Sequence, residues 1–286
     1  PLLKQIFCSN NLKALTWINS FCQQGLEKFF NDINNINILG FGSIVFDFII
    51  SKIFKTFIII GSGDSNFFGL RIGRTDVAAS EKWNMLHQKA GSLRIDYDLI
   101  YIFSEQELPV DSNSICLVDT KTIYAKSIDD SAIMPSTIER YQETVPNADL
   151  YRLALVSGVY SRFRLDDCFP AESYVRMYRC WIERSVDGSM ADVVLVHRTD
   201  NLIDGMITLK IDLDVAHIGL VAVEESAQGK GIGTTLIKAV EAYLQSNTNV
   251  RHLKVATQLS NKPACRLYEK NGFVVEEKTN IYHWWL

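Results

Sequence analysis

A glycine-rich turn between an apolar run and an amphipathic segment has the residue types to bind a phosphate group. Residues 218–223 are short, apolar and rich in β-branched side chains, which predicts a buried strand. The sequence Gln228-Gly229-Lys230-Gly231-Ile232-Gly233 follows, and apolar residues then recur at helical spacing to about Gln245. A strand that leads into a helix N-terminus gathers unpaired backbone N–H groups at the positive end of the helix dipole. We therefore expect a phosphate or pyrophosphate at this turn, with glycines that let it approach the backbone.

Two familiar phosphate-binding motifs do not match this turn. A P-loop requires Gly-Lys-Ser/Thr after a four-residue gap, and the sequence has no such run here. A dinucleotide-binding fingerprint requires the spacing G-x-G-x-x-G and an acidic residue at the end of the next strand. The glycines here are spaced G-x-G-x-G, and the next predicted strand, residues 253–257, leads into Gln258. The turn therefore needs a different interpretation.

A second motif lies downstream, over residues 261–273. Asn261 is predicted to cap a helix, Pro263 to lie in its first turn, and Asn271-Gly272 to end it. One face of this helix would carry three residues: Ala264, Leu267 and Tyr268. The phenol of Tyr268 is then either a packed aromatic ring or a proton donor.

Together the two motifs resemble the signatures of the GNAT family of acetyl-CoA-dependent acyltransferases. Residues 228–233 are similar to Gln/Arg-x-x-Gly-x-Gly/Ala, and residues 261–273 to N-x-x-A-x-x-L-Y-x-K-x-G-F. The resemblance implies an α/β (α+β) fold with a mixed, twisted sheet, acetyl-CoA as co-substrate, and no metal. It also implies that Tyr268 protonates the departing CoA thiolate, which is chemically reasonable because a tyrosine pKa near 10 lies close to that of a thiol.

The same resemblance implies the residues that hold acetyl-CoA. Backbone groups of the strand would meet the pantetheine arm where two strands splay apart, and the N–H groups of the turn would hold the pyrophosphate. Gln228 and Lys230 would lie at the rim, and Asn261 would touch the pantetheine. The full set is Leu220, Val221, Ala222, Val223, Gln228, Gly229, Lys230, Gly231, Ile232, Gly233, Thr234, Asn261, Ala264 and Lys270.

A third group of segments narrows the resemblance within the family. The run Ser161-Arg162-Phe163-Arg164, a helix with Tyr178 and Trp181, and the closing residues 282–285 are similar to the TDP-fucosamine acetyltransferases. This branch acetylates the amino group of a nucleotide-linked 4-amino-4,6-dideoxyhexose, and the implied substrate contacts are Arg162, Phe163, Arg164 and Tyr178. Guanidinium groups pair well with phosphate oxygens, although a surface salt bridge is the alternative for both arginines.

The general base stays open at the level of the sequence. The carboxylate candidates are Glu224, Asp166, Asp167 and Glu172, and a water chain would suffice for an amine that is partly neutral near pH 8. Each of these side chains is more often a solvated surface charge. We expect His217 and His283 to be structural or exposed. Other acceptors, such as a protein N-terminus or another small amine, and a catalytically silent GNAT-like binding module are the remaining alternatives.

Composition excludes several classes of protein. The chain has 286 residues, 47% hydrophobic and 22% charged, as in ordinary globular proteins. Its formal net charge of -4 disfavours nucleic-acid binding. The 6 cysteines form no CxxC pair and no zinc-ligand spacing, which favours free thiols in a reducing cytoplasm. No signal peptide is visible, so a cytoplasmic protein is expected, and a homodimer stays open.

Three segments are expected along the chain. Residues 1–57 form an apolar, mostly helical extension of unclear role, in which Asp47, Lys52 and Lys55 argue against a transmembrane helix. Residues 58–130 form a small, truncated GNAT-like α/β domain, and residues 131–286 the GNAT acetyltransferase domain. The predicted strands are 57–60, 67–72 after a turn at 64–66, 98–103, 114–125, 193–198, 205–211, 216–223, 253–257 and a hairpin of 273–276 with 280–285. The predicted helices are 78–91, 150–159, 171–186, 232–245 and 261–270, with a charged loop at 160–167.

Overall fold

The computed structural model describes residues 58–60, 62–77, 83, 86, 93–110, 114–128 and 133–286. The predicted extension at 1–57 and most of the predicted helix at 78–91 lie outside these residues. Residues Ile58–Leu286 form one compact unit. No helix in the described part of this unit is long and apolar enough to cross a membrane.

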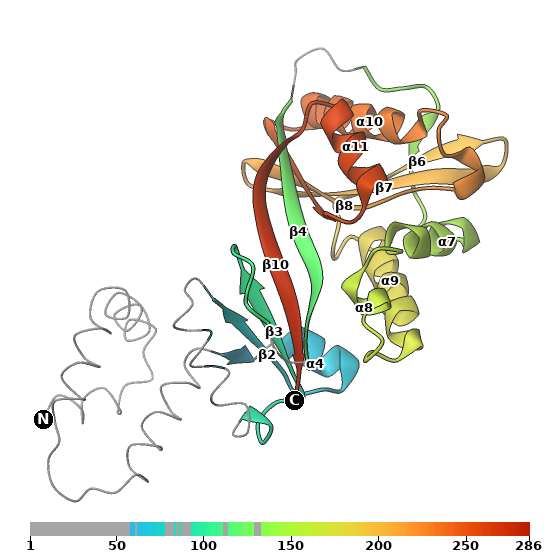
Figure 1. Ribbon diagram of the computed structural model, residues 1–286. Coiled ribbons are helices and arrows are strands. Elements are labelled where there is room, and N and C mark those ends of the chain that lie inside the picture. The colour runs from blue at the N-terminus through green and yellow to red at the C-terminus, as the bar shows by residue number, and fades with distance from the viewer. Residues whose placement is uncertain are drawn as a thin grey trace, which may run out of the picture. The chain divides into compact units, whose positions relative to one another are not determined.

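One mixed sheet runs through this unit (Figure 1). Its 10 strands have the order β1-β2-β3-β10-β4-β9-β8-β7-β6-β5. Only the β2–β3 and β8–β9 pairs are parallel. The strands are β1 (Ile59–Ile60), β2 (Ile72–Asp76), β3 (Leu99–Ser104), β4 (Ile115–Ser127), β5 (Ile138–Arg140), β6 (Val193–Thr199), β7 (Leu202–Asp212), β8 (Val215–Val223), β9 (His252–Gln258) and β10 (Val274–Trp285). The mixed α/β fold predicted from the sequence is confirmed.

The helices cover both faces of the sheet. They are α4 (Ser62–Phe68), α7 (Ala148–Ser157), α8 (Arg162–Leu165), α9 (Ala171–Val186), α10 (Ile232–Asn247) and α11 (Lys262–Lys270). Along β6, Val193 and Leu195 belong to the core under α10, whereas Val194 and Val196 belong to the core under α7 and α9. Because alternate residues of a strand point to opposite faces, α10 and α11 lie on one side of the sheet and α7 to α9 on the other.

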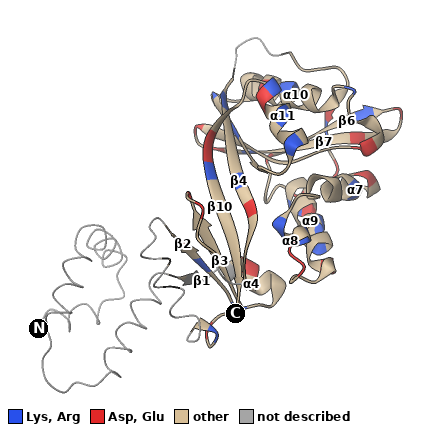
Figure 2. Ribbon diagram, in the orientation of Figure 1, with Lys and Arg blue, Asp and Glu red and all other residues tan. Residues whose placement is uncertain are grey.

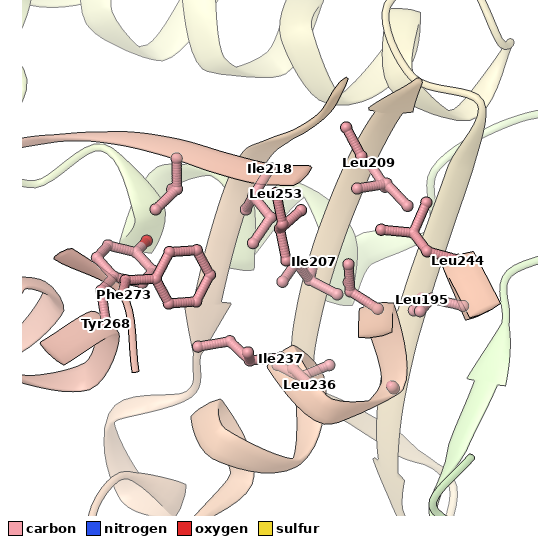
Figure 3. Close-up of a cluster of buried hydrophobic side chains, with 14 of the residues drawn as sticks. Leu195, Ile207, Leu209, Ile218, Leu236, Ile237, Leu244, Leu253, Tyr268 and Phe273 are labelled. Carbon is pink, nitrogen blue, oxygen red and sulfur yellow. The ribbon is translucent and has the colours of Figure 1, made fainter. Parts of the chain in front are cut away.

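The core beneath α10 and α11 is aliphatic at one end and aromatic at the other (Figure 3). Leu236 and Ile237 of α10 are fully buried against Ile207 of β7. Tyr268 and Phe273 close the core at the α11 end. This packing fixes the positions of both sequence motifs relative to the strands.

The predicted helix boundaries hold closely in the C-terminal half. The predicted helix at 171–186 is α9, and that at 232–245 is α10 with two further residues. Asn261 caps α11 as predicted, because its side chain accepts a hydrogen bond from the Ala264 N–H at 3.2 Å. The charged loop predicted at 160–167 contains the short helix α8.

The turn predicted at 64–66 and the strand predicted at 67–72 are wrong. Helix α4 occupies most of this stretch, and Gly69 ends it at a φ of 69° by donating to the Ser65 carbonyl at 2.9 Å. Phe68 packs against Phe163 and Phe169 at ring-centroid distances of 5.3 and 4.9 Å. Phe68 of α4 therefore packs against aromatic residues of and beside α8, and β2 begins only at Ile72.

The predicted C-terminal hairpin is also wrong. Residues Val274–Trp285 form a single strand, β10, whose polar first half is exposed. Strand β4 pairs with β10 in antiparallel register from Ala125–Val274 to Ile115–Trp284. The strand that pairs with β10 is thus β4, whose paired residues lie more than 140 positions away along the chain. Local periodicity does not reveal such a distant partner. The domain boundary predicted at residue 130 remains a prediction.

Candidate active site

Strands β8 and β9 separate part-way along their length. Their parallel pairing runs from Val215–His252 to Ile218–Val255 and stops there. Beyond this point β8 continues beside β7 as far as Val223, and β9 continues beside β4 as far as Gln258. Backbone groups along the facing edges of the two strands are therefore released from the sheet at the place where a splay was expected.

A bulge in β8 marks the point of separation. The register between β7 and β8 shifts between the Ile207 and Leu209 pairs, and the Thr208 hydroxyl accepts a hydrogen bond from the Leu220 N–H at 2.8 Å. A Cβ at Gly219 would lie 2.6 Å from the Thr208 Oγ1. Glycine is therefore needed here for the strand to bend around the threonine.

The glycine-rich turn follows the end of β8 directly. A 3-10 turn, η1 (Glu225–Ala227), leads to Gln228, whose side chain donates to the Val223 carbonyl at 3.1 Å. Gly229 and Gly231 have φ angles of 77° and 87°, and Gly231 precedes α10. Among the described residues, no acceptor is recorded for the backbone N–H groups of residues 229–234. These donors lie at the N-terminus of a 16-residue helix, which is the arrangement that binds a phosphate.

Helix α11 packs beside this turn. A Cβ at Gly233 would lie 3.1 Å from the Leu267 side chain, so the third glycine allows the close approach of the two helices. Asn271 donates to the Thr234 hydroxyl at 3.2 Å. Lys270 is exposed on the same helix. The two sequence motifs are thus in direct contact.

Tyr268 lies in the core beneath α11 and is 4% exposed. Its ring centroid is 5.7 Å from that of Tyr124 and 5.7 Å from that of Phe273. Burial, with a smaller effect from Cys265, raises the pKa of Tyr268 above its ordinary value of 10. The phenol is therefore protonated throughout the neutral range and can only donate a proton there.

On the other face of the sheet, Arg162 and Arg164 have different neighbours. The Arg162 guanidinium lies 4.8 Å from the Tyr101 ring centroid, and its Nε is buried without a recorded partner in the described chain. Arg164 is exposed and donates to the Val159 carbonyl at 2.9 Å. Figure 2 shows that Lys and Arg residues gather on α8 and α9. Of the two arginines Arg162 and Arg164, only Arg162 is held against the sheet.

Phe163 and Tyr178 are packed residues. Phe163 is 7% exposed and lies 5.5 Å from Phe169 between ring centroids. Tyr178 is 5% exposed, and a Cβ at Gly158 would lie only 2.3 Å from its Cζ. Tyr178 belongs to the same core as Leu220 and Ala222 of β8, so α9 reaches the separating strand from this face.

The comparisons with known proteins agree with this geometry. Residues 161–273 match the family described as the acetyltransferase (GNAT) family. The chain carries a GNAT acetyltransferase domain.

Two curated proteins and one solved structure are similar to parts of this chain. The dTDP-fucosamine acetyltransferase of Escherichia coli is 34% identical over 131 residues, which cover 44% of this chain and 54% of that protein. The spore coat polysaccharide biosynthesis protein SpsD of Bacillus subtilis is 27% identical over 133 residues, which cover 46% of this chain and 45% of that protein. The chain thus spans about half the length of these curated relatives. A crystal structure of PaiA N-acetyltransferase from Thermoplasma acidophilum with coenzyme A aligns at a TM-score of 0.41 and 20% identity, covering 52% of this chain and 99% of that one.

The carboxylates predicted as candidate bases of the GNAT domain differ in how they are engaged. Glu224 pairs with Arg152 at 2.5 Å, and Arg152 also pairs with Asp149 at 2.9 Å. Asp166 accepts hydrogen bonds from the His283 ring and from the Trp285 indole. Although burial acts to raise the pKa of Asp166, these hydrogen bonds outweigh it and lower the pKa. Asp167 and Glu172 are exposed.

His283 has partners that the sequence did not reveal. Its side chain is fully buried, donates to Asp166 through Nδ1, and stacks on Tyr101 at 4.9 Å between ring centroids. Burial lowers the pKa of His283, so the ring is neutral at pH 7. A structural role was expected and fits these contacts. His217 is exposed.

Asp119 is the ionisable residue at this site that sequence reasoning missed. It lies on β4, and its Oδ1 is buried without a recorded partner in the described chain. Burial raises the pKa of Asp119 to about 6 against the opposing effects of Arg162, the Thr120 N–H and Lys121. Nothing in the run Leu117-Val118-Asp119-Thr120 distinguishes this carboxylate from a solvated strand residue. Among the described residues, no group of His, Cys, Asp and Glu side chains is placed to hold a metal ion.

Proposed function

We propose that this chain transfers the acetyl group of acetyl-CoA to the amino group of a nucleotide-linked amino-deoxyhexose. The observation that carries the proposal is the set of N–H groups at residues 229–234 that have no recorded acceptor among the described residues, next to the point where β8 and β9 separate. Acetyl-CoA would supply an activated acetyl group as a thioester. Its pyrophosphate would meet the glycine turn, and its pantetheine arm would meet the free edge of β8 at residues 220–223.

The glycine turn fits a bound pyrophosphate. Gly229 and Gly231 adopt left-handed φ angles, and a Cβ at either would meet no atom within 4 Å. The space beside these two glycines is therefore open. The side chains of Gln228 and Lys230 lie exposed at the edge of this space. Asn261 and Ala264, at the start of α11, are only partly buried and complete the proposed set.

Tyr268 is proposed as the general acid that protonates the CoA thiolate. The phenol is protonated at neutral pH, so it has a proton to give when the thiolate forms, although its raised pKa makes that transfer less favourable. The ring also packs on Phe273, so the residue serves the core whatever its chemical role. Substitution by Phe separates the two roles.

Two observations support a sugar nucleotide as acceptor. One is the similarity to the dTDP-fucosamine acetyltransferase over 131 residues. The other is the buried, unpaired Arg162 Nε, a donor suited to a phosphate or sugar oxygen. Phe163 and Tyr178 would form the walls of this subsite, with Arg164 at its exposed rim. The free cysteines Cys168, Cys180 and Cys265 of the described residues fit a reducing cytoplasm, where we place the reaction within surface-polysaccharide biosynthesis.

Thiol release from acetyl-CoA against a panel of acceptors tests the proposal. The panel contains dTDP-4-amino and dTDP-3-amino sugars, peptides with free N-termini, polyamines, and the corresponding sugars without an amino group. We expect release with the amino sugars alone. Release with peptides or polyamines instead would replace the proposed acceptor, and acetyl-CoA binding without release for any amine would indicate a binding module.

A further inference from the structure

Asp119 lies at the open end of the gap between β8 and β9. The last pair between β4 and β9 is Lys121 with Gln258, so Asp119 is two residues beyond the end of β9. The strand runs without a bulge against β9 from Lys121 to Ser127, and Tyr124 points toward α11, where it packs on Tyr268. By alternation, Asp119 points to the opposite face, which carries α8 and α9.

Among the described residues, three charged or titratable side chains interact electrostatically with Asp119. Arg162 of α8 and Lys121 of β4 both lower its pKa. Tyr178 faces it from α9, and the Asp119 charge acts to raise the pKa of that phenol. The carboxylate therefore lies among the residues proposed to bind the acceptor, on the face of the gap opposite Tyr268.

Asp119 differs from the candidate bases Glu224 and Asp166 in having a buried oxygen without a recorded partner in the described chain. Glu224 is paired with Arg152, and Asp166 accepts from His283 and Trp285. The Oδ1 of Asp119 is buried and has no recorded partner within the part of the chain that the structure describes. A buried acceptor without a donor is costly, so such an atom is expected to receive a hydrogen bond from a ligand or water.

We propose that Asp119 binds the amino group of the acceptor and removes its proton before acetyl transfer. This role rests on the proposed function. The acceptor arrives as an ammonium group and gives one proton to the Asp119 carboxylate, which leaves a neutral amine. The amine nitrogen then forms a bond with the acetyl carbon while the carbon–sulfur bond breaks. Tyr268 protonates the thiolate and is reprotonated by the second nitrogen proton, and Asp119 releases its proton to solvent.

The role fixes the sign of the pH dependence. Asp119 accepts a proton only when ionised, so kcat/KM for the acceptor should fall as the pH drops through about 6. Arg162 lowers this pKa, so Arg162→Gln should move the acid limb of the profile to higher pH. A carboxylate with only a structural role would leave the position of the limb unchanged.

The experiment compares Asp119→Asn with Asp212→Asn, an exposed aspartate at the end of β7, in the full chain. We expect kcat/KM of Asp119→Asn to fall by about 10²–10⁴-fold and its acid limb near pH 6 to disappear. Calorimetry should show unchanged acetyl-CoA affinity, and Asp212→Asn should match the wild type.

Two results would overturn the role in distinguishable ways. An active wild type whose Asp119→Asn variant keeps its rate and its acid limb refutes the role of Asp119 and leaves the proposed function intact. A wild-type chain that acetylates no amine refutes the proposed function together with this role. Thermal unfolding of Asp119→Asn shows whether a loss of rate reflects loss of the fold.

Discussion

Tyr268 joins a buried aromatic ring to a hydroxyl that is protonated at neutral pH. Tyr268→Phe removes the hydroxyl and keeps the packing on Tyr124 and Phe273. We expect kcat to fall by about 10²–10⁴-fold, with thermal stability and acetyl-CoA affinity nearly unchanged. The measurement is single-turnover acetyl transfer. A Phe variant with near-normal turnover would show that another group protonates the thiolate.

Arg162 and Arg164 offer a matched pair of variants on one short helix. Arg162→Ala removes a guanidinium held over Tyr101, whereas Arg164→Ala removes one that is exposed and bonded to the Val159 carbonyl. We expect Arg162→Ala to weaken binding of the sugar nucleotide by about 1.5–3 kcal/mol, the value of a charged hydrogen bond. Arg164→Ala should change this binding free energy much less. Michaelis constants for both substrates provide the measurement. If both variants changed binding of the sugar nucleotide equally, Arg162 would have no greater role in binding than Arg164.

Sequence reasoning at the scale of single residues succeeded where a motif fixes the local geometry. The Asn261 cap and the end of α11 at Asn271 follow from backbone chemistry within a few positions. Asp119 and His283 could not be identified in the same way. Their surroundings come from α8, α9 and β3, which the sequence places far from them.

At the scale of elements, the glycine turn makes a specific prediction about acetyl-CoA. Gly231 and Gly188 have φ angles of 87° and 86°, and a Cβ at either would meet no atom within 4 Å. Gly231→Ala and Gly188→Ala therefore carry the same backbone strain, but only Gly231 lies at the proposed pyrophosphate site. We expect Gly231→Ala to weaken acetyl-CoA binding by at least about tenfold, or about 1.4 kcal/mol, in calorimetry. Equal affinities for the two variants would contradict the assignment of the turn.

The elements that were predicted well are those whose own residues show a clear helical or strand pattern. Helix α9 has apolar residues at helical spacing, and its bounds were predicted without error. The predicted C-terminal hairpin failed because the polar run Glu276-Glu277-Lys278-Thr279 looks like a turn but lies on the exposed half of a long strand. Strand β4 pairs with this run and keeps it extended, and no feature of the nearby sequence predicts that pairing.

At the scale of the whole unit, β4 connects the two halves of the sequence. It lies between β9 and β10 in the sheet. Lys126 of β4 forms an ion pair with Glu241 of α10 at 2.6 Å, with side-chain exposures of 15% and 8%. Tyr124 donates to Glu269 of α11 at 2.8 Å. The motif-bearing helices are therefore tied to a strand from outside residues 131–286.

Truncation tests this dependence. A piece of residues 131–286 leaves β9 and β10 without their shared neighbour and leaves Glu241 without its cation, a loss worth about 3–5 kcal/mol for a buried pair. We expect this piece to lack cooperative thermal unfolding, whereas residues 58–286 unfold cooperatively in circular dichroism. A shorter piece that unfolds at the same temperature and binds acetyl-CoA would show that residues 131–286 are an independent domain.

Acetyl transfer to an amine is the central claim, and analysis of the product tests it most directly. The full chain is incubated with acetyl-CoA and a dTDP-4-amino-4,6-dideoxyhexose, and the sugar nucleotide is examined by mass spectrometry. We predict a gain of one acetyl group per molecule, matched by an equal amount of free CoA and resistant to hydroxylamine, as an amide is and an ester is not. Unchanged sugar nucleotide after prolonged incubation with a protein that binds acetyl-CoA would contradict the account.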